Sequence, residues 1–158
     1  LLTAASLNST SSLLKQPNGQ TIYDLKKNSR FRLGLEFGAS SLANVTAYFT
    51  MGLFGLGEEY YGFELSGTTL SGSSSNANTG SSNAITLKTL SVSTIYELEA
   101  RYNNLDQIQF YVNGVLLGVI RTELPNGYPS AFPFFYIKTT NTVAKSVIVS
   151  YFEILQER

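Results

Sequence analysis

The sequence predicts an all-β protein, folded as an antiparallel jelly-roll β-sandwich. Apolar and polar residues alternate along most of the chain, which is typical of strands buried on one face only. No segment keeps apolar residues at helical spacing over three turns. Turn signals separate about eight or nine of the alternating runs, a number typical of sandwiches and jelly rolls. The length of 158 residues fits one domain.

The first half of the chain supplies four expected strands. Aromatic and aliphatic residues occupy every second position over residues 30–37, and residues 44–53 continue this pattern. Residues 61–65 form a third run, and residues 85–87 lie in a fourth, short one. The spacing predicts that each strand turns one face to the core and the other to solvent.

The second half contains the clearest local signal, the dipeptide Asn113-Gly114 between two apolar runs. This dipeptide predicts a type I′ hairpin, because that turn needs a positive φ at both central residues. The strands expected here cover residues 96–102, 108–112, 115–120, 134–139 and 147–155. The inward positions of the whole chain predict a core of Phe31, Leu33, Leu35, Phe49, Met51, Phe63, Leu98, Phe110, Val112, Phe152 and Ile154.

Two segments depart from this pattern. Residues 1–20 are expected to be a linker or docking segment, and the start at Leu1-Leu2-Thr3 is expected to mark a processed product or a piece of a longer chain. Residues 21–158 are expected to form the single sandwich domain. Within it, residues 66–83 are almost entirely Ser, Gly, Asn and Thr, which predicts a long flexible loop.

Composition excludes several classes of function. Eleven basic residues balance eleven acidic ones, so the chain lacks the excess of Lys and Arg that binds nucleic acid. The absence of Cys and His removes disulfides, structural zinc and the Ser-His-Asp or Cys-His triads. No apolar run approaches the length of a membrane-spanning helix, so no membrane insertion is expected.

Three motifs of the second half then carry a resemblance: a Tyr96-x-Leu98 strand, a hairpin that reads Phe-Tyr-Val-Asn-Gly over residues 110–114, and a final strand that reads Tyr-Phe-Glu-Ile over residues 151–154. In this order they resemble the concanavalin A-like lectin/glucanase and laminin-G-like jelly rolls. The match covers roughly residues 95–155, and the first half fits by strand pattern alone. The resemblance implies a concanavalin A-like sandwich.

The resemblance implies several functions rather than one. Members of that superfamily cleave glycans, bind sugars or act as structural modules. Examples without catalytic residues are parts of phage and viral surface proteins. The resemblance therefore allows a location on a virion or another extracellular surface.

Catalysis is not expected. Glycoside hydrolysis needs two carboxylates about 5 to 9 Å apart, and the glucanases of the superfamily carry a Glu-x-Asp-x-x-Glu strand. The aspartates, Asp24 and Asp106, lie in no such motif. Glu97 and Glu99 share a strand face, but Arg101 follows on the same side, so we expect a solvated charged row. No Asp-x-Asp or Asp-x-Asn cluster suggests calcium, and no cofactor or metal is expected.

Sugar binding without a metal needs a flat aromatic ring with amide or hydroxyl groups around it. Trp is absent, but Tyr is plentiful. The candidate glycan-binding residues are those expected in surface loops or at outward strand positions: Tyr60, Tyr61, Tyr111, Asn126 and Tyr128. The alternative interpretation is that these tyrosines close the core and keep only their hydroxyls in water.

Several outward strand positions carry apolar or aromatic residues where a monomer usually places charge. The candidate interface residues between subunits of a homo-oligomer are Tyr48, Phe54, Ile95, Leu116 and Ile120. The alternative interpretation is that loops of the same chain cover these positions.

Taken together, the residues and the resemblance favour a non-enzymatic structural or adhesion domain of a surface assembly, such as a virion, that acts through contacts with other protein subunits. The alternative is a carbohydrate-binding module that uses surface tyrosines, with a cell-surface glycan as its partner. A glycoside hydrolase is a distant third.

Overall fold

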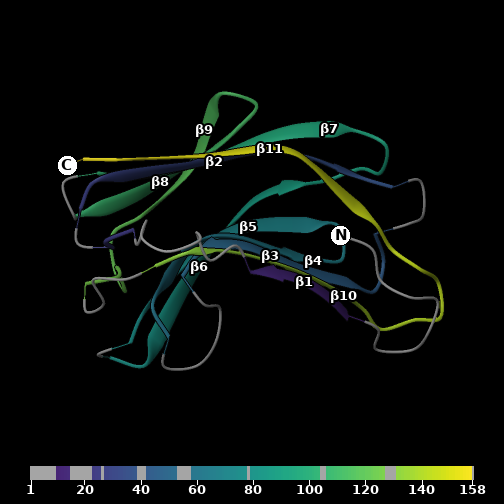
Figure 1. Cartoon of the computed structure of the whole chain (residues 1–158), viewed down its shortest axis with the longest axis horizontal. Coiled ribbons are helices and arrows are strands. Elements are labelled where there is room, and N and C mark those ends of the chain that lie inside the picture. Colours follow the sequence, from purple (N-terminus) through teal and green to yellow (C-terminus); the bar gives the residue numbers. More distant parts are fainter. Residues whose placement is uncertain are drawn as a thin grey trace.

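The computed structural model describes residues 10–14, 23–25, 27–38, 42–52, 58–77, 79–103, 106–126 and 131–157. These residues form eleven strands in two antiparallel sheets that face each other (Figure 1). The prediction of an all-β antiparallel sandwich is therefore confirmed. The fold follows from the alternation in the sequence, because each strand buries one side against the opposite sheet.

The lower sheet of Figure 1 has six strands in the order β1-β10-β3-β4-β5-β6. Their bounds are β1 Thr10–Leu14, β3 Val45–Met51, β4 Tyr60–Ser66, β5 Thr69–Asn76, β6 Ser81–Thr89 and β10 Pro133–Thr139. The upper sheet has five strands in the order β11-β2-β7-β8-β9. Their bounds are β2 Ser29–Phe37, β7 Ile95–Asn103, β8 Gln107–Val112, β9 Val115–Ile120 and β11 Val147–Gln156.

The core is a layer of aromatic rings and aliphatic side chains between the sheets. Phe135 of the six-stranded sheet lies 6.1 Å, centroid to centroid, from Phe31 of the five-stranded sheet. Phe63 and Phe110 make a second contact between the sheets at 5.6 Å, edge to face. The predicted core residues are all buried, except that Phe152 and Ile154 are only partly buried and pack against its rim.

The hairpin between β8 and β9 has the turn that the sequence predicts. Asn113 and Gly114 adopt φ values of 51° and 77°, both positive as a type I′ turn requires. The register slips between Phe110 and Tyr111, which places an extra residue in β9. This bulge changes which residues of β9 face the core.

Most of the segment predicted as a flexible loop, residues 66–83, is strand instead, and residue 78 lies outside the described residues. The segment contains all of β5 and the start of β6, which pair with each other and with β4. Leu70 anchors β5 in the core, and Gly72 lies under the ring of Phe110. The small residues of β5 let the opposite sheet approach closely, so a composition typical of a loop is here that of a closely packed strand.

Part of the predicted linker is also a strand. Thr10–Leu14 forms β1, which pairs antiparallel with β10 at the edge of the six-stranded sheet. The remainder of residues 1–20 lies outside the described residues.

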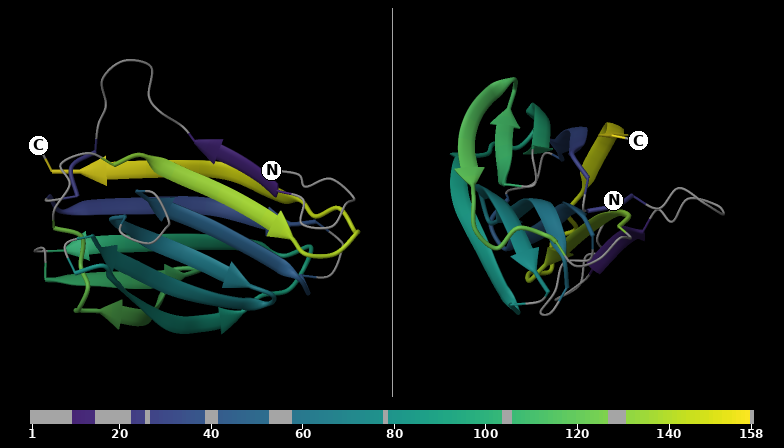
Figure 2. Two further views of the ribbon diagram at one scale, coloured as in Figure 1. Left: turned by 90° about the horizontal axis from the view of Figure 1, so that it is seen from below. Right: turned by 90° about the vertical axis from the view of Figure 1, so that its left-hand side faces the viewer.

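The six-stranded sheet is arched. Figure 1 shows its hollow side turned away from the five-stranded sheet, and the view from below in Figure 2 looks onto that side. We call the outward side of this sheet the hollow face. The sandwich therefore presents two outer surfaces of different shape.

We predict that Gly72→Ala destabilises the protein. A Cβ at this position would lie 2.5 to 2.7 Å from three ring atoms of Phe110, which is fixed in the core. Overpacking of this kind costs about 1–3 kcal/mol of unfolding free energy, measurable by urea or thermal denaturation. Ser71→Ala, one residue away on the outward side, is the matched control. A variant as stable as wild type, or more stable, would mean that this segment behaves as a loop, where Gly→Ala stabilises.

Candidate functional site

The two outer faces differ in their charge. The strands of the six-stranded sheet contain three charged residues: Glu64, Lys88 and Lys138. The strands of the five-stranded sheet contain seven: Arg30, Arg32, Glu36, Glu97, Glu99, Arg101 and Glu153. We call the outward side of the five-stranded sheet the charged face. Each face is considered separately as a candidate site.

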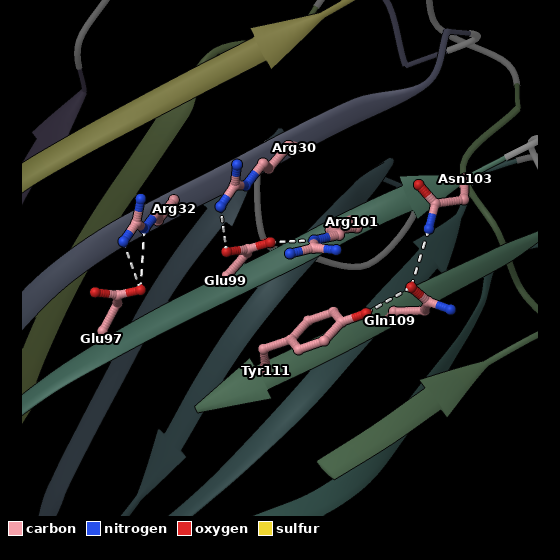
Figure 3. A network of polar contacts seen from close by, with 8 residues as sticks. All are labelled: Arg30, Arg32, Glu97, Glu99, Arg101, Asn103, Gln109 and Tyr111. Carbon is pink, nitrogen blue, oxygen red and sulfur yellow. Dashed lines mark hydrogen bonds and ion pairs between the residues drawn. The ribbon is translucent and has the colours of Figure 1, made fainter. Parts of the chain in front are cut away.

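The charged face carries a network of ion pairs between β2 and β7 (Figure 3). Arg30 contacts one carboxylate oxygen of Glu99 at 2.6 Å, and the Nε of Arg101 binds the other oxygen. Arg32 donates two hydrogen bonds, of 2.6 and 3.1 Å, to a single oxygen of Glu97. The predicted sharing of one strand face by Glu97 and Glu99 is confirmed, but Glu99 is buried rather than solvated.

A second set of contacts continues this network onto β8. The guanidinium of Arg101 lies over the ring of Tyr111, 4.4 Å from the ring centroid. The hydroxyl of Tyr111 donates to Gln109 at 2.9 Å, and the amide of Asn103 donates to the same oxygen at 3.0 Å (Figure 3). The polar groups of this face are thus bound largely to one another.

The pKa of Glu99 reflects these partners. Burial alone would raise the pKa of this carboxyl, but the hydrogen bonds from Arg30 and Arg101 outweigh burial and lower it. A surface depression of about 480 Å³ lies beside these ion pairs, and Arg30 and Arg101 form part of its lining. Since both arginines already bind Glu99, we interpret this face as a structural network.

The hollow face is different, because aromatic and hydroxyl side chains dominate it. Register pairs place Tyr136, Tyr48, Glu64 and Ser71 in one row across β10, β3, β4 and β5. The rings of Tyr48 and Tyr136 stack at 5.6 Å with 25° between their planes. Phe134 stacks on Tyr136 at 6.1 Å and 18°. The row and the adjacent Phe134 therefore bring three nearly parallel rings together with a carboxylate.

Glu64 lies next to the rings, in partly buried surroundings. Burial raises the pKa of its carboxyl above the ordinary value. Burial also raises the pKa of Tyr60 to about 12, and the negative charge of Glu64 acts in the same direction. The pKa of Tyr48 is also raised, mainly by burial and secondly by the negative charge of Glu64. The carboxylate and the two tyrosines thus share one local environment.

The structure separates the predicted glycan-binding residues. Tyr61 is fully buried between the sheets, where its hydroxyl makes a 2.7 Å hydrogen bond with Ser29, so its assignment to a surface site is wrong. Tyr60 belongs to the hollow face but is only 4% exposed. Tyr111 lies on the charged face, under Arg101.

Two predicted glycan-binding residues follow β9. Asn126 is exposed, and its backbone N–H donates to Glu59, the neighbour of Tyr60, at 3.3 Å. Tyr128 lies outside the described residues. The structure thus links Asn126 to Glu59, the residue before Tyr60, and leaves Tyr111 on the other sheet.

The predicted interface residues do not form one surface. Ile95 and Leu116 of the five-stranded sheet are 68% and 46% exposed, as expected. Ile120 is buried, contrary to prediction, because the bulge in β9 turns it inward opposite Ile108. Tyr48 is half-buried on the hollow face, and Phe54 lies outside the described residues.

Sequence reasoning missed three members of the hollow face: Glu64, Phe134 and Tyr136. The alternation of residues 134–139 places Phe134 and Tyr136 outward, and this signal was available. The sequence gives no signal that these residues lie beside Tyr48, because β10 and β3 are far apart in the chain. Glu64 could have been found as the one acidic residue in a strand of aromatic and apolar residues.

No protein-family description matches the chain, and no characterised protein matches it in sequence. Solved structures do match. Bacillus licheniformis β-glucanase superimposes with a TM-score of 0.67 at 13% identity, over 96% of this chain and 79% of that one. The chain has the concanavalin A-like lectin/glucanase fold. The resemblance seen in the sequence is therefore confirmed as a resemblance of fold.

Two further matches show the range of proteins with this fold. A family 7 alginate lyase, solved in complex with its product, has a TM-score of 0.66 at 12% identity, over 98% of this chain and 75% of that one. Botulinum neurotoxin type C, whose cell entry depends on interaction with two ganglioside molecules, has a TM-score of 0.60 at 12% identity, over 92% of this chain and 36% of that one. Enzymes and a binding protein thus share the concanavalin A-like fold, and none of these matches bears on a virion location, which stays a prediction.

Two searches of the described residues found nothing further. They contain no group of three or more acidic side chains arranged to hold a metal ion. Across the same ranges no helix has the length and apolar character needed to cross a membrane.

We predict that Glu99→Gln lowers stability by about 1–3 kcal/mol at pH 7, because it leaves two arginines beside a neutral amide. The folded-state pKa of Glu99 is lowered, so its contribution is present above the unfolded pKa of about 4.3 and disappears as the pH falls through the folded value. Urea denaturation of both proteins from pH 8 to pH 3 measures the difference, which should shrink at the acid end. Glu153→Gln, an exposed carboxylate on β11, is the control. A difference that is constant with pH would contradict the ion-pair explanation.

Proposed function

We propose that this protein is a non-catalytic carbohydrate-binding domain whose ligand lies on the hollow face. The observation that carries this proposal is the row of Tyr136, Tyr48 and Glu64, with Phe134 stacked on Tyr136, which joins aromatic rings to a carboxylate on one arched sheet. Ser71 extends the row onto β5.

The aromatic part of the row suits the apolar side of a sugar ring. Pyranose rings present C–H groups that pack on aromatic surfaces, and Tyr adds a hydroxyl at the edge of the contact. The four strands of the row span roughly 14 Å at about 4.8 Å per strand. That length suits an oligosaccharide better than a single sugar.

The polar part of the row suits sugar hydroxyls. A carboxylate accepts hydrogen bonds and forms shorter, stronger ones than a neutral acceptor does. Glu64 is half-buried beside Tyr48, where such bonds are less exposed to competition from water.

The arrangement of carboxylates supports binding rather than cleavage. Hydrolysis of a glycosidic bond uses a pair of carboxylates about 5 to 9 Å apart. Glu64 is the only acidic residue in the strands of the six-stranded sheet. Glu97 and Glu99 belong to the other sheet, where arginines hold them.

The comparisons support the proposal through chemistry rather than sequence. A β-glucanase and an alginate lyase with its product share the fold, and both names refer to polysaccharides. The neurotoxin interacts with gangliosides.

We predict that Tyr48→Ala and Tyr136→Ala each weaken binding of the domain to oligosaccharides about tenfold, which corresponds to about 1.4 kcal/mol for a lost ring contact. The probes are fluorescently labelled β-glucan, alginate and ganglioside-type oligosaccharides, screened on an array and then measured by titration. Loss of affinity is expected because each substitution removes one ring of the stack.

Two controls keep this prediction sharp. Tyr136→Phe keeps the ring and should keep most of the affinity, which separates ring stacking from misfolding. Tyr111→Ala removes a tyrosine from the charged face and should leave binding unchanged. If no oligosaccharide binds, or if Tyr111→Ala weakens binding as much as Tyr136→Ala, the proposal is wrong.

A second candidate function is assembly with other protein subunits, and the hairpin of β9 favours it. β9 is the edge of its sheet, and the sequence of its strand, Val-Leu-Leu-Gly-Val-Ile, contains no charge. Val115, Leu116 and Leu117 are exposed, as is Ile95. An uncharged, apolar edge strand is a template for pairing with a second chain.

We predict that, if this edge makes homo-oligomers, Leu116→Glu converts them to monomers, because charge on an edge strand opposes pairing. Multi-angle light scattering at micromolar concentration measures the state. Ile148→Glu, an equally apolar exposed position on β11, is the control. A wild-type protein that is monomeric throughout this range would remove the assembly candidate.

A further inference from the structure

Within the described part of the chain, the site proposed above contains a carboxylate that forms no ion pair, Glu64. The three ion pairs among the described residues all lie on the charged face, and none includes Glu64. Glu64 is half-buried between Tyr48 on β3 and Ser71 on β5, its register partners on the two neighbouring strands. Its charge is therefore directed toward whatever occupies the hollow face.

The two lysines of the six-stranded sheet do not offset this charge. Lys138 lies on β10, two strands from β4, roughly 10 Å away at about 4.8 Å per strand. Lys88 lies on β6 at the other side, and its ammonium group is 5.9 Å from the ring of Tyr96 on the five-stranded sheet. The centre of the hollow face is thus negative wherever Glu64 is ionised.

Neighbouring groups increase the effect of this charge. Tyr48 and Tyr60 flank Glu64 with partly or fully buried rings, so water screens its charge less than that of an exposed carboxylate. A sugar hydroxyl in this position donates to the carboxylate and is held by it. The carboxylate of a uronic or sialic acid meets a like charge in partly buried surroundings, which disfavours binding.

We propose that the hollow face selects uncharged oligosaccharides and rejects chains of uronic or sialic acids, with Glu64 as the residue that determines this specificity. This inference rests on the glycan-binding function proposed above. It assigns a class of ligand to the site and a role to one side chain. It also distinguishes this chain from proteins of the same fold that act on alginate.

The test measures selectivity with ligands that differ only in charge. Alginate oligosaccharides and their carboxyl-reduced, uncharged counterparts of equal length are titrated into wild type and Glu64→Gln at pH 8, well above the ordinary range of a carboxyl pKa. A sialylated oligosaccharide and its carboxyl-reduced, uncharged counterpart form a second pair. We expect wild type to prefer the uncharged member of a pair at least tenfold, and Glu64→Gln to reduce that preference at least fivefold.

The control is Glu153→Gln, which removes the same charge from an exposed position on the opposite sheet. It should leave the preference unchanged, and the preference of wild type should weaken in high salt. The selectivity inference is wrong if wild type binds the acidic member of a pair as tightly as the uncharged member. It is also wrong if Glu64→Gln keeps the full preference, or if Glu153→Gln reduces the preference as much as Glu64→Gln does. In each of these cases the binding function stands. If no member of either pair binds, both proposals are overturned.

Discussion

The packing of aromatic rings between the two sheets is the constraint on which the rest of the molecule depends. Phe135 contacts Phe31 and Phe49, at 6.1 and 6.0 Å, and Phe63 meets Phe110 edge to face. Gly72 of β5 provides the space that the ring of Phe110 occupies. The glycine in the middle of β5 is therefore a consequence of aromatic packing across the core.

This packing also determines the outer faces. Because side chains of a strand alternate, every residue committed to the core assigns its neighbours to the outside. Leu98 and Ala100 point inward, which places Glu97, Glu99 and Arg101 together on the charged face, where they form ion pairs. On β3 and β10 the same alternation turns tyrosine and phenylalanine outward. One face is consequently stabilised by its own ion pairs, while the other keeps a carboxylate and aromatic rings that those ion pairs do not involve.

The fold could be predicted from the sequence because alternation, turn residues and the Asn113-Gly114 hairpin are local signals. The candidate site could be predicted only in part. Tyr48 and Tyr60 were identified as outward or surface residues, but their neighbours Tyr136 and Glu64 were not grouped with them. Pairing of β10 with β3 depends on contacts between distant segments, which no local pattern encodes. The prediction that Ile120 is exposed was wrong for a related reason, since a single bulge in β9 reverses the alternation on which it depended.

Among the described residues, Glu64 lies on the hollow face, where no ion pair of the charged face reaches it. Burial disfavours the ionised form of a carboxyl, and a structural role would offset that cost with an arginine, as the protein does for Glu99. Glu64 has no such ion pair in the part of the chain that the structure describes, and it lies beside stacked rings on an arched sheet. In the proposed complex, a hydrogen-bond donor from the ligand offsets part of the cost of burying this carboxylate. Sugar hydroxyls are donors of this kind, and a second negative charge is not.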